Sequence, residues 1–183
     1  MVQNGLDGQV YMARKAVAGE RGRLTMRLTP GNSGGSFVVG TATGARDAGA
    51  QFEEVEADTL EAILAECGLA QEEVAFVWAD VQGCETEVIA SGSALWKRGV
   101  PLWAEVEPTS LGRQGGLDTF VNVAAAHFDR FIEADELKRE GAAAVPQPIS
   151  RLGRLVDSIT PEQVSTDVLL LPPGVASPSG AAR

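Results

Sequence analysis

The stretch EVAFVWADVQGCETEVIASGSALWKRGVPLWAEVEP, residues 73–108, decides how this chain folds. Residues 74–79 (VAFVWA) form an unbroken apolar run, which predicts a strand buried on both faces. The run ends at Asp80 and is followed by a turn. Across residues 84–97, apolar side chains recur at roughly helical spacing, which predicts a helix. Residues 100–106 (VPLWAEV) predict a second buried strand, so we expect a right-handed βαβ unit.

Polar residues stand at the carboxyl ends of both predicted strands. Asp80 and Gln82 follow the first strand, and Glu107 follows the second. In an open α/β sheet, ligands bind outside the carboxyl ends of the strands. We therefore expect Asp80 and Glu107 to face one crevice, and we expect chemistry there. The tryptophans of this stretch, Trp78, Trp96 and Trp103, are expected to anchor the core.

Composition places the chain among ordinary globular proteins. Its 183 residues are 44% apolar and 22% charged, and this length suits one domain with a sizeable core. We expect a single α/β domain over residues 1–172. Residues 173–183 are rich in proline, glycine, serine and alanine and predict a disordered tail.

Charge and hydropathy argue against several classes of partner. A formal charge of −10 does not suit nucleic acid, because phosphate binding needs clustered Lys and Arg. No apolar run approaches the roughly 18–20 residues that cross a bilayer, and no signal peptide is evident, so we expect a cytoplasmic protein. The cysteines, Cys67 and Cys84, predict buried reduced thiols. The lone His127 has no Cys or His neighbours, so no metal site is predicted.

The flanking sequence predicts further strands and helices around the central unit. Before it, we expect strands at residues 9–17, 23–28, 36–39 and 51–56 and a helix at residues 59–67. After it, we expect helices at residues 117–126 and 148–159 and strands at residues 127–133 and 167–171.

An ordered set of short motifs resembles the FkbM family of S-adenosylmethionine-dependent methyltransferases. The central motifs are DVQGCE at residues 80–85, VI at 88–89, SG at 91–92, GVP at 99–101 and EVEP at 105–108. Upstream motifs in the family's order are NGL at 4–6, AV at 16–17, Gly19, Gly22, NSG at 32–34 and DTL at 58–60. Downstream, TDVLLLP at residues 166–172 is similar to the family's closing strand. The resemblance therefore covers about residues 4–172.

The resemblance implies a Rossmann-like class I methyltransferase sheet, S-adenosyl-L-methionine as cofactor and an oxygen of a small molecule or sugar as methyl acceptor. It also implies roles for individual side chains. It assigns catalysis to Asp80 and Glu107, cofactor binding to Ala16, Val17, Asp80 and Gln82, and acceptor binding to Asn32 and Glu85.

Each of these residues also has a structural interpretation. Asp80 could cap the following helix, and Glu107 could form a salt bridge with an arginine. Glu85 could interact with the dipole of the helix that it begins. Asn32 lies in PGNSGG, which is mainly a turn signal, and Ala16 with Val17 could simply contribute to packing.

The glycine-rich turn that such enzymes use to hold the cofactor is not found before residue 73. The nearest candidate, PGNSGG at residues 30–35, follows a half-exposed strand and opens no helix. By the resemblance, the first two strands of the sheet are missing. Either the chain is part of a longer enzyme, or the strand at residues 9–17 has moved beside residues 74–79. A non-catalytic remnant that acts as an interaction domain is the alternative function, and another Rossmann-like nucleotide binder is a third.

Overall fold

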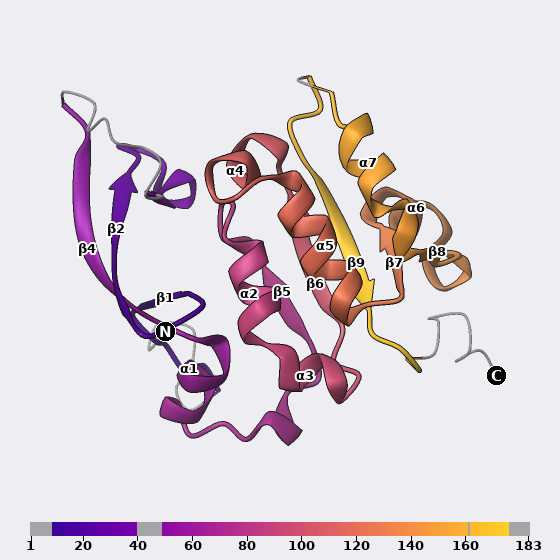
Figure 1. Cartoon of the computed structure of the whole chain (residues 1–183), viewed down its shortest axis with the longest axis horizontal. Coiled ribbons are helices and arrows are strands. Elements are labelled where there is room, and N and C mark those ends of the chain that lie inside the picture. The colour runs from indigo at the N-terminus through magenta and orange to yellow at the C-terminus, as the bar shows by residue number, and fades with distance from the viewer. Residues whose placement is uncertain (1–8, 40–48, 161, 176–183) are drawn as a thin grey trace.

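The computed structural model describes residues 9–39, 49–160 and 162–175, which form a mixed α/β fold (Figure 1). One sheet has four strands in the order β1-β4-β2-β3, and the other has five strands in the order β5-β6-β9-β7-β8. The strands are β1 Lys15–Val17, β2 Gly22–Leu28, β3 Phe37–Val38, β4 Gln51–Asp58, β5 Val77–Ala79, β6 Leu102–Val106, β7 Arg130–Glu133, β8 Gln147–Pro148 and β9 Thr166–Leu171. The helices are α1 Leu60–Glu66, α2 Glu85–Ser91, α3 Ser93–Lys97, α4 Pro108–Arg113, α5 Leu117–His127, α6 Ala134–Glu140 and α7 Leu152–Ser158.

The four-stranded sheet is built around an antiparallel pair. β2 and β4 pair from Gly22 opposite Ala57 to Leu28 opposite Gln51, and β1 lies parallel to β4 on its other side. The strand predicted at residues 9–17 is shorter than expected, because residues 9–14 are exposed and belong to no strand. The possibility that this strand had moved beside residues 74–79 is wrong, since β1 pairs with β4.

The predicted βαβ unit is present in the five-stranded sheet. β5 and β6 are parallel, with Val77 opposite Leu102, and helices α2 and α3 lie between them in the chain. The predicted helix at residues 84–97 is interrupted at Gly92. A Cβ atom at Gly92 would lie only 2.6 Å from Cζ2 of Trp96, and Nε1 of Trp96 donates to the carbonyl oxygen of Ile89 at 2.7 Å. The Trp96 ring thus packs closely over the point where the helix breaks.

The last strand lies inside the five-stranded sheet. β9 pairs antiparallel with β6 on one side and with β7 on the other. The buried strand predicted at residues 167–171 is therefore confirmed. The strand predicted at residues 127–133 begins only at Arg130 and is followed at the sheet edge by β8. The chain stays in contact with this sheet through Val175, whose carbonyl oxygen accepts from Arg130 at 2.7 Å. Val175, which the prediction placed in the disordered tail, is therefore in contact with the sheet, and residues 176–183 of the predicted tail lie outside the described part.

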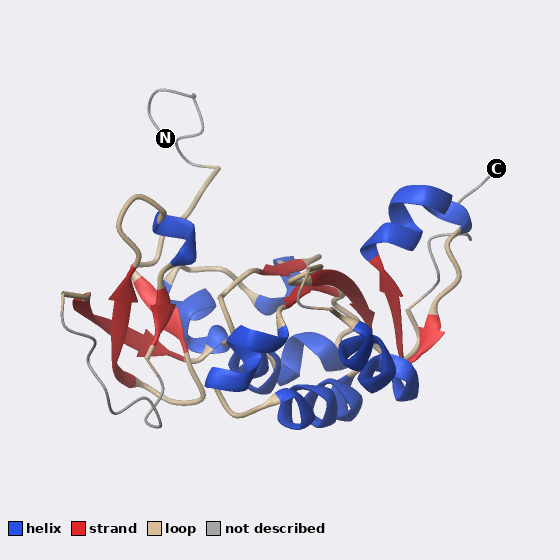
Figure 2. Cartoon of the chain, turned by 90° about the horizontal axis from the view of Figure 1, so that it is seen from above, coloured by secondary structure: helices blue, strands red, loops and turns tan. Residues whose placement is uncertain are grey.

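The main core lies between one face of this sheet and helices α2, α3, α5 and α7. Figure 2 shows the helices gathered along that side. The largest fully buried side chains there are Trp96, Phe120, Phe131, Ile89, Leu95 and Leu102. On the opposite face, a small cluster around Ile132, Ala144 and Leu171 is packed by Leu137 of α6 and by Val175.

The predicted burial of residues 74–79 on both faces is wrong. Phe76 is 46% exposed and Trp78 is 65% exposed, because β5 is the outermost strand of its sheet and helices cover only one of its faces. Trp78 is therefore not a core anchor. It stacks on half-buried Trp103 with ring centroids 5.1 Å apart, whereas Trp96 is buried as expected.

Truncation of buried Trp96 and of exposed Trp78 tests on which face of the five-stranded sheet the core lies. We expect Trp96→Ala to lower the free energy of unfolding by about 3–5 kcal/mol, because it empties a fully packed site. Trp78→Ala removes only a stacking contact and should cost about 1 kcal/mol. Urea unfolding of both variants measures the difference. Similar losses for the two would contradict the one-sided core.

Candidate functional site

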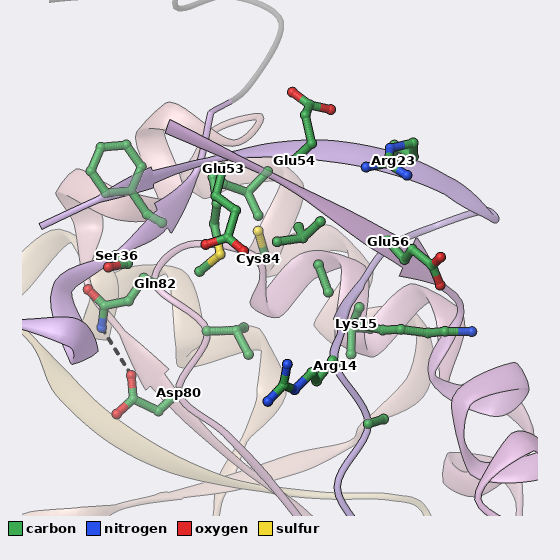
Figure 3. A pocket seen from close by; sticks show the side chains of 18 of the residues that line it. Arg14, Lys15, Arg23, Ser36, Glu53, Glu54, Glu56, Asp80, Gln82 and Cys84 are labelled. Atoms are coloured by element: carbon green, nitrogen blue, oxygen red, sulfur yellow. Dashed lines mark hydrogen bonds between the residues drawn. The ribbon is translucent and has the colours of Figure 1, made fainter. Parts of the chain in front are cut away.

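The candidate site is a cavity of about 800 Å³ between the four-stranded sheet and the turn that follows β5, here called the inter-sheet cavity (Figure 3). Its volume lies in the range of small-molecule sites, about 300–1,000 Å³. Apolar side chains contribute to its walls, and several charged and amide groups reach it. The lining includes Arg14, Lys15, Ala16, Val17, Arg23, Met26, Ser36, Val38, Glu53, Val55, Asp80, Val81, Gln82 and Cys84.

The cavity brings together residues that are far apart in the sequence. Ala16 and Val17 reach it from β1, and Asp80 and Gln82 reach it from the turn after β5. These are the four residues to which the resemblance assigned cofactor binding. Figure 3 shows Asp80 and Gln82 on one side of the cavity and Arg14 on another.

A buried carboxylate holds the 80–83 turn in shape. Glu85, which is 2% exposed, accepts from the backbone N–H groups of Val81 and Gly83, each at 3.0 Å. Gln82 and Gly83 have positive φ angles of 52° and 102°, a conformation that a non-glycine residue such as Gln82 rarely adopts. The two bonds to Glu85 span this conformation and offset its strain. Glu85 is thus enclosed in the turn and does not line the cavity.

Burial raises the pKa of Glu85 to about 7, although the two backbone N–H groups act in the opposite direction. Burial is the larger effect here because the carboxylate is removed from water, and the negative charge of Glu105 adds to it. The carboxylate that shapes the turn therefore titrates near neutral pH.

The amide of Gln82 joins two carboxylates at the rim of the cavity. Its Nε2 donates to Oδ1 of Asp80 at 3.0 Å and to Oε2 of Glu105 at 3.1 Å. The hydroxyl of Ser165 donates to the other oxygen of Glu105 at 3.1 Å. Burial raises the pKa of Glu105, and the nearby charges of Asp80 and Glu107 raise it further. This network fixes Gln82, and Asp80 remains exposed at the rim of the cavity.

Glu105 was not among the candidates from the sequence, although it lies in the EVEP motif. Strand alternation could have identified it. Ala79 pairs with Ala104, so the next residues along the two parallel strands, Asp80 and Glu105, emerge on the same face of the sheet.

Glu107 lies at the start of α4. It occupies the N-cap position, and its Oε2 accepts from the hydroxyl of Ser110 at 2.5 Å. It is not among the residues that line the inter-sheet cavity. Asp80 and Glu107 are thus linked through the intervening Glu105, whose pKa both charges raise, and only Asp80 faces the cavity.

The structure also tests the structural interpretations of Asp80 as a helix cap and of Asn32 as a turn residue. Asp80 does not cap the following helix, because Cys84 is the N-cap residue of α2 and makes no side-chain cap bond. Asn32 is exposed and lies outside the lining. Its N–H donates to Thr29 at 3.1 Å and its carbonyl oxygen accepts from Gly35 at 3.1 Å, so its backbone closes a turn.

The remaining charges of the cavity are mixed. Arg14 and Arg23 line it together with Glu53, Glu54 and Glu56. The hydroxyl of Thr25 donates to Glu54 at 2.6 Å. Such a lining suits a ligand that presents both hydrogen-bonding groups and an apolar ring.

Residues 9–39, 49–160 and 162–175 contain no group of three or more His, Cys, Asp and Glu side chains that could hold a metal ion. Within the same residues, no helix is long and apolar enough to span a bilayer. His127 lies in the last turn of α5, where burial and nearby Lys97 lower its pKa.

Comparison with protein-family models, curated proteins and solved structures finds no match to this chain.

Replacement of Gly83 tests the geometry of the turn. A Cβ atom there would lie far inside van der Waals contact with the carbonyl oxygen of Ser110, and the φ angle is unfavourable for alanine. We expect Gly83→Ala to lower the free energy of unfolding by about 3 kcal/mol or more. Gly112→Ala is the matched control, because nothing lies within 4 Å of its Cβ position; it should leave stability unchanged or raise it by up to about 1 kcal/mol. Chemical denaturation of both variants provides the measurement.

Removal of the titrating carboxylate should change how stability depends on pH. Because the pKa of Glu85 rises from 4.5 in the unfolded chain to about 7 in the fold, the folded state binds more protons between these values. Glu85 therefore stabilises the fold most below pH 4.5, and at most about 3 kcal/mol of this is lost as the pH rises through 7.

In Glu85→Gln this part of the pH dependence should disappear, so the gap in unfolding free energy between wild type and variant narrows as the pH rises. Urea unfolding from pH 4.5 to 8 measures this gap, with Asp157→Asn on the exposed surface of α7 as control. A constant gap across this range would show that Glu85 does not titrate there.

Proposed function

We propose that this chain is part of an FkbM-type S-adenosylmethionine-dependent methyltransferase that methylates an oxygen of a small molecule or sugar. One observation carries the proposal. Ala16, Val17, Asp80 and Gln82, the residues to which the resemblance assigned the cofactor, come from separate strands and line one cavity of suitable size. The proposed family rests on the order of the motifs in the sequence, and the proposed ligand site rests on the cavity.

The lining fits the parts of the cofactor. The carboxylate of Asp80 can accept from hydroxyl groups of a ribose or of the acceptor, as carboxylates do in nucleotide-binding sites. Val17 and Val81, with the methylene groups of their neighbours, offer an apolar surface to a purine ring. Asn32 and Glu85, which the resemblance assigned to the acceptor, lie outside the lining, so acceptor binding falls to other residues of the cavity.

S-adenosyl-L-methionine held by these residues would supply an electrophilic methyl group, which the acceptor oxygen would take from the sulfonium sulfur. Asp80 would orient the acceptor hydroxyl and take its proton. Positioning can supply much of the rate of such a transfer, so no strong base is required.

The architecture also supports a methyltransferase sheet from which strands are missing. Parallel β5, β6 and β7 are combined with antiparallel β9, which corresponds to the closing strand in the resemblance. Among the described residues, β5 has no strand on its other side. In the family, the first two strands would lie between the strand corresponding to β1 and the one corresponding to β5. The open edge of β5 agrees with their absence and with a longer parent enzyme.

Calorimetry with S-adenosylhomocysteine tests the proposal. We expect weak or absent binding to this chain, and binding at least about tenfold tighter once the sequence upstream of it in its reading frame is added. In the longer form, Asp80→Asn should lower methyl transfer by about 10²-fold or more while the unfolding midpoint changes little. Asp157→Asn, on the exposed surface of α7, is the charge-matched control and should leave both unchanged.

Two results would contradict the enzyme. One is the absence of binding in both the short and the extended chain. The other is an equal loss of stability and turnover in Asp80→Asn, which would make Asp80 a structural residue. The first result would favour the non-catalytic interaction domain, for which the exposed Phe76 and Trp78 are the specific observation.

A further inference from the structure

A row of carboxylates crosses one face of the five-stranded sheet. Ala79 lies opposite Ala104 in the parallel pair of β5 and β6. The next residues along the two strands, Asp80 and Glu105, therefore emerge side by side. On the other side of β6, Glu105 lies opposite Asp167 of β9. Like charges directly opposite each other destabilise a sheet, so this row needs something that reduces its negative charge.

The described part of the chain supplies no cation to this row. Among residues 9–39, 49–160 and 162–175, no Lys, Arg or His forms an ion pair with Asp80, Glu105 or Asp167. Lys15 lines the same cavity as Asp80, but it pairs with Glu66. Protonation of a carboxylate is another means of reducing the charge of the row.

One amide nitrogen brings two of these carboxylates together. Nε2 of Gln82 donates both to Oδ1 of Asp80, at 3.0 Å, and to Oε2 of Glu105, at 3.1 Å. Figure 3 shows the bond to Asp80 as a dashed line. An amide is neutral, so it stabilises this arrangement through hydrogen bonds but leaves two negative charges close together. Where two carboxyl groups share a site in this way, one of them tends to keep its proton.

The contacts of Glu105 make it the member of the pair that keeps the proton. Burial raises the pKa of Glu105, and a hydrogen bond with the side chain of Asp80 raises it further. The hydrogen bond from the hydroxyl of Ser165 acts in the opposite direction, because it stabilises the ionised form. Burial is the largest of these effects.

The charged groups that face Glu105 come from several elements. Asp80 follows β5, Glu85 begins α2, Glu107 precedes α4 and Asp167 lies in β9. All of them are acidic. Each negative charge opposes the ionisation of Glu105, so the charges and the burial act in the same direction.

We propose that Asp80 and Glu105 share one proton at pH values at which isolated carboxyl groups have lost theirs. Glu105 holds the proton and donates it in a hydrogen bond to Asp80, while Gln82 and Ser165 position the two carboxyl groups. The pair then carries one negative charge instead of two, and it can release or take up a proton at the rim of the inter-sheet cavity. This property belongs to the chain itself and does not depend on methyl transfer.

A role in catalysis rests on the proposed function. In the proposed methyltransferase, Asp80 takes the proton of the acceptor hydroxyl, and Glu105 is a positioning residue that orients Asp80 through the shared hydrogen bond. After this transfer the pair holds two protons and no charge, and it returns one proton to water before the next turnover.

NMR of the carboxyl carbons tests the shared proton in the full 13C-labelled chain without any ligand. Between about pH 3 and pH 9, the carbons of Asp80 and Glu105 should both respond to two common steps, because the two groups are coupled. The upper step should lie well above the ordinary carboxyl range of about pH 4. In Glu105→Gln the upper step should disappear.

Two further variants should move the upper step in opposite directions. Ser165→Ala should raise it, because the hydrogen bond that favours the ionised form is lost. Glu107→Gln should lower it, because a nearby negative charge is removed. Asp157→Asn, on the exposed surface of α7, is the control and should leave it unchanged. Urea unfolding verifies that every variant is folded.

Independent titration of Asp80 and Glu105 within the ordinary range would overturn the proposal. An upper step that persists in Glu105→Gln, or that moves in the same direction in Ser165→Ala and Glu107→Gln, would also overturn it.

The role in catalysis has a separate test in the extended chain. There, Glu105→Gln should lower methyl transfer by about tenfold or more and shift its pH profile. If the extended wild type transfers no methyl group but the two-step titration is present, the proposed function is wrong and the shared proton stands. If methyl transfer and its pH profile are unchanged in Glu105→Gln, the positioning role is wrong.

Discussion

The geometry of the candidate site depends on a buried carboxylate that receives two backbone N–H groups. By accepting from Val81 and Gly83, Glu85 compensates for the positive φ angle of Gln82. That conformation turns the Gln82 amide toward Asp80 and Glu105 and directs Asp80 to the cavity. The same two bonds therefore help to fix the direction of the chain at the end of β5. Glu85 therefore acts on the site without touching what the site would bind.

The architecture around this turn gives β5 two different surroundings. At its carboxyl end, β5 presents polar groups to a cavity shared with β1. Along its length it presents Trp78 to the outside, because helices cover only the opposite face. In the proposed parent enzyme, upstream strands would lie along the edge of β5, so the same strand would contribute both to the candidate site and to the middle of a wider sheet.

The sequence predicted the helices and strands better than the burial and tertiary contacts of their side chains. Apolar runs and helical spacing located β5, α2 and β6, because these signals are local, but the strand predicted at residues 74–79 is shortened to Val77–Ala79. The burial of Trp78 was predicted wrongly, because an apolar strand does not reveal which of its faces another element covers. The break at Gly92 was missed because it depends on the tertiary position of Trp96. Glu105 was overlooked in favour of Glu107, although strand alternation places Glu105 beside Asp80.

The position of β9 has a consequence for how this chain folds during synthesis. β9 is the last strand in sequence, yet it lies between β6 and β7. While the chain emerges from the ribosome, β6 and β7 have no ladder between them until residues 166–171 arrive. Pairings between such distant segments form late, because loop closure must come first. Both strands then remain open to incorrect pairing until β9 has been synthesised, which makes this protein a candidate for chaperone assistance.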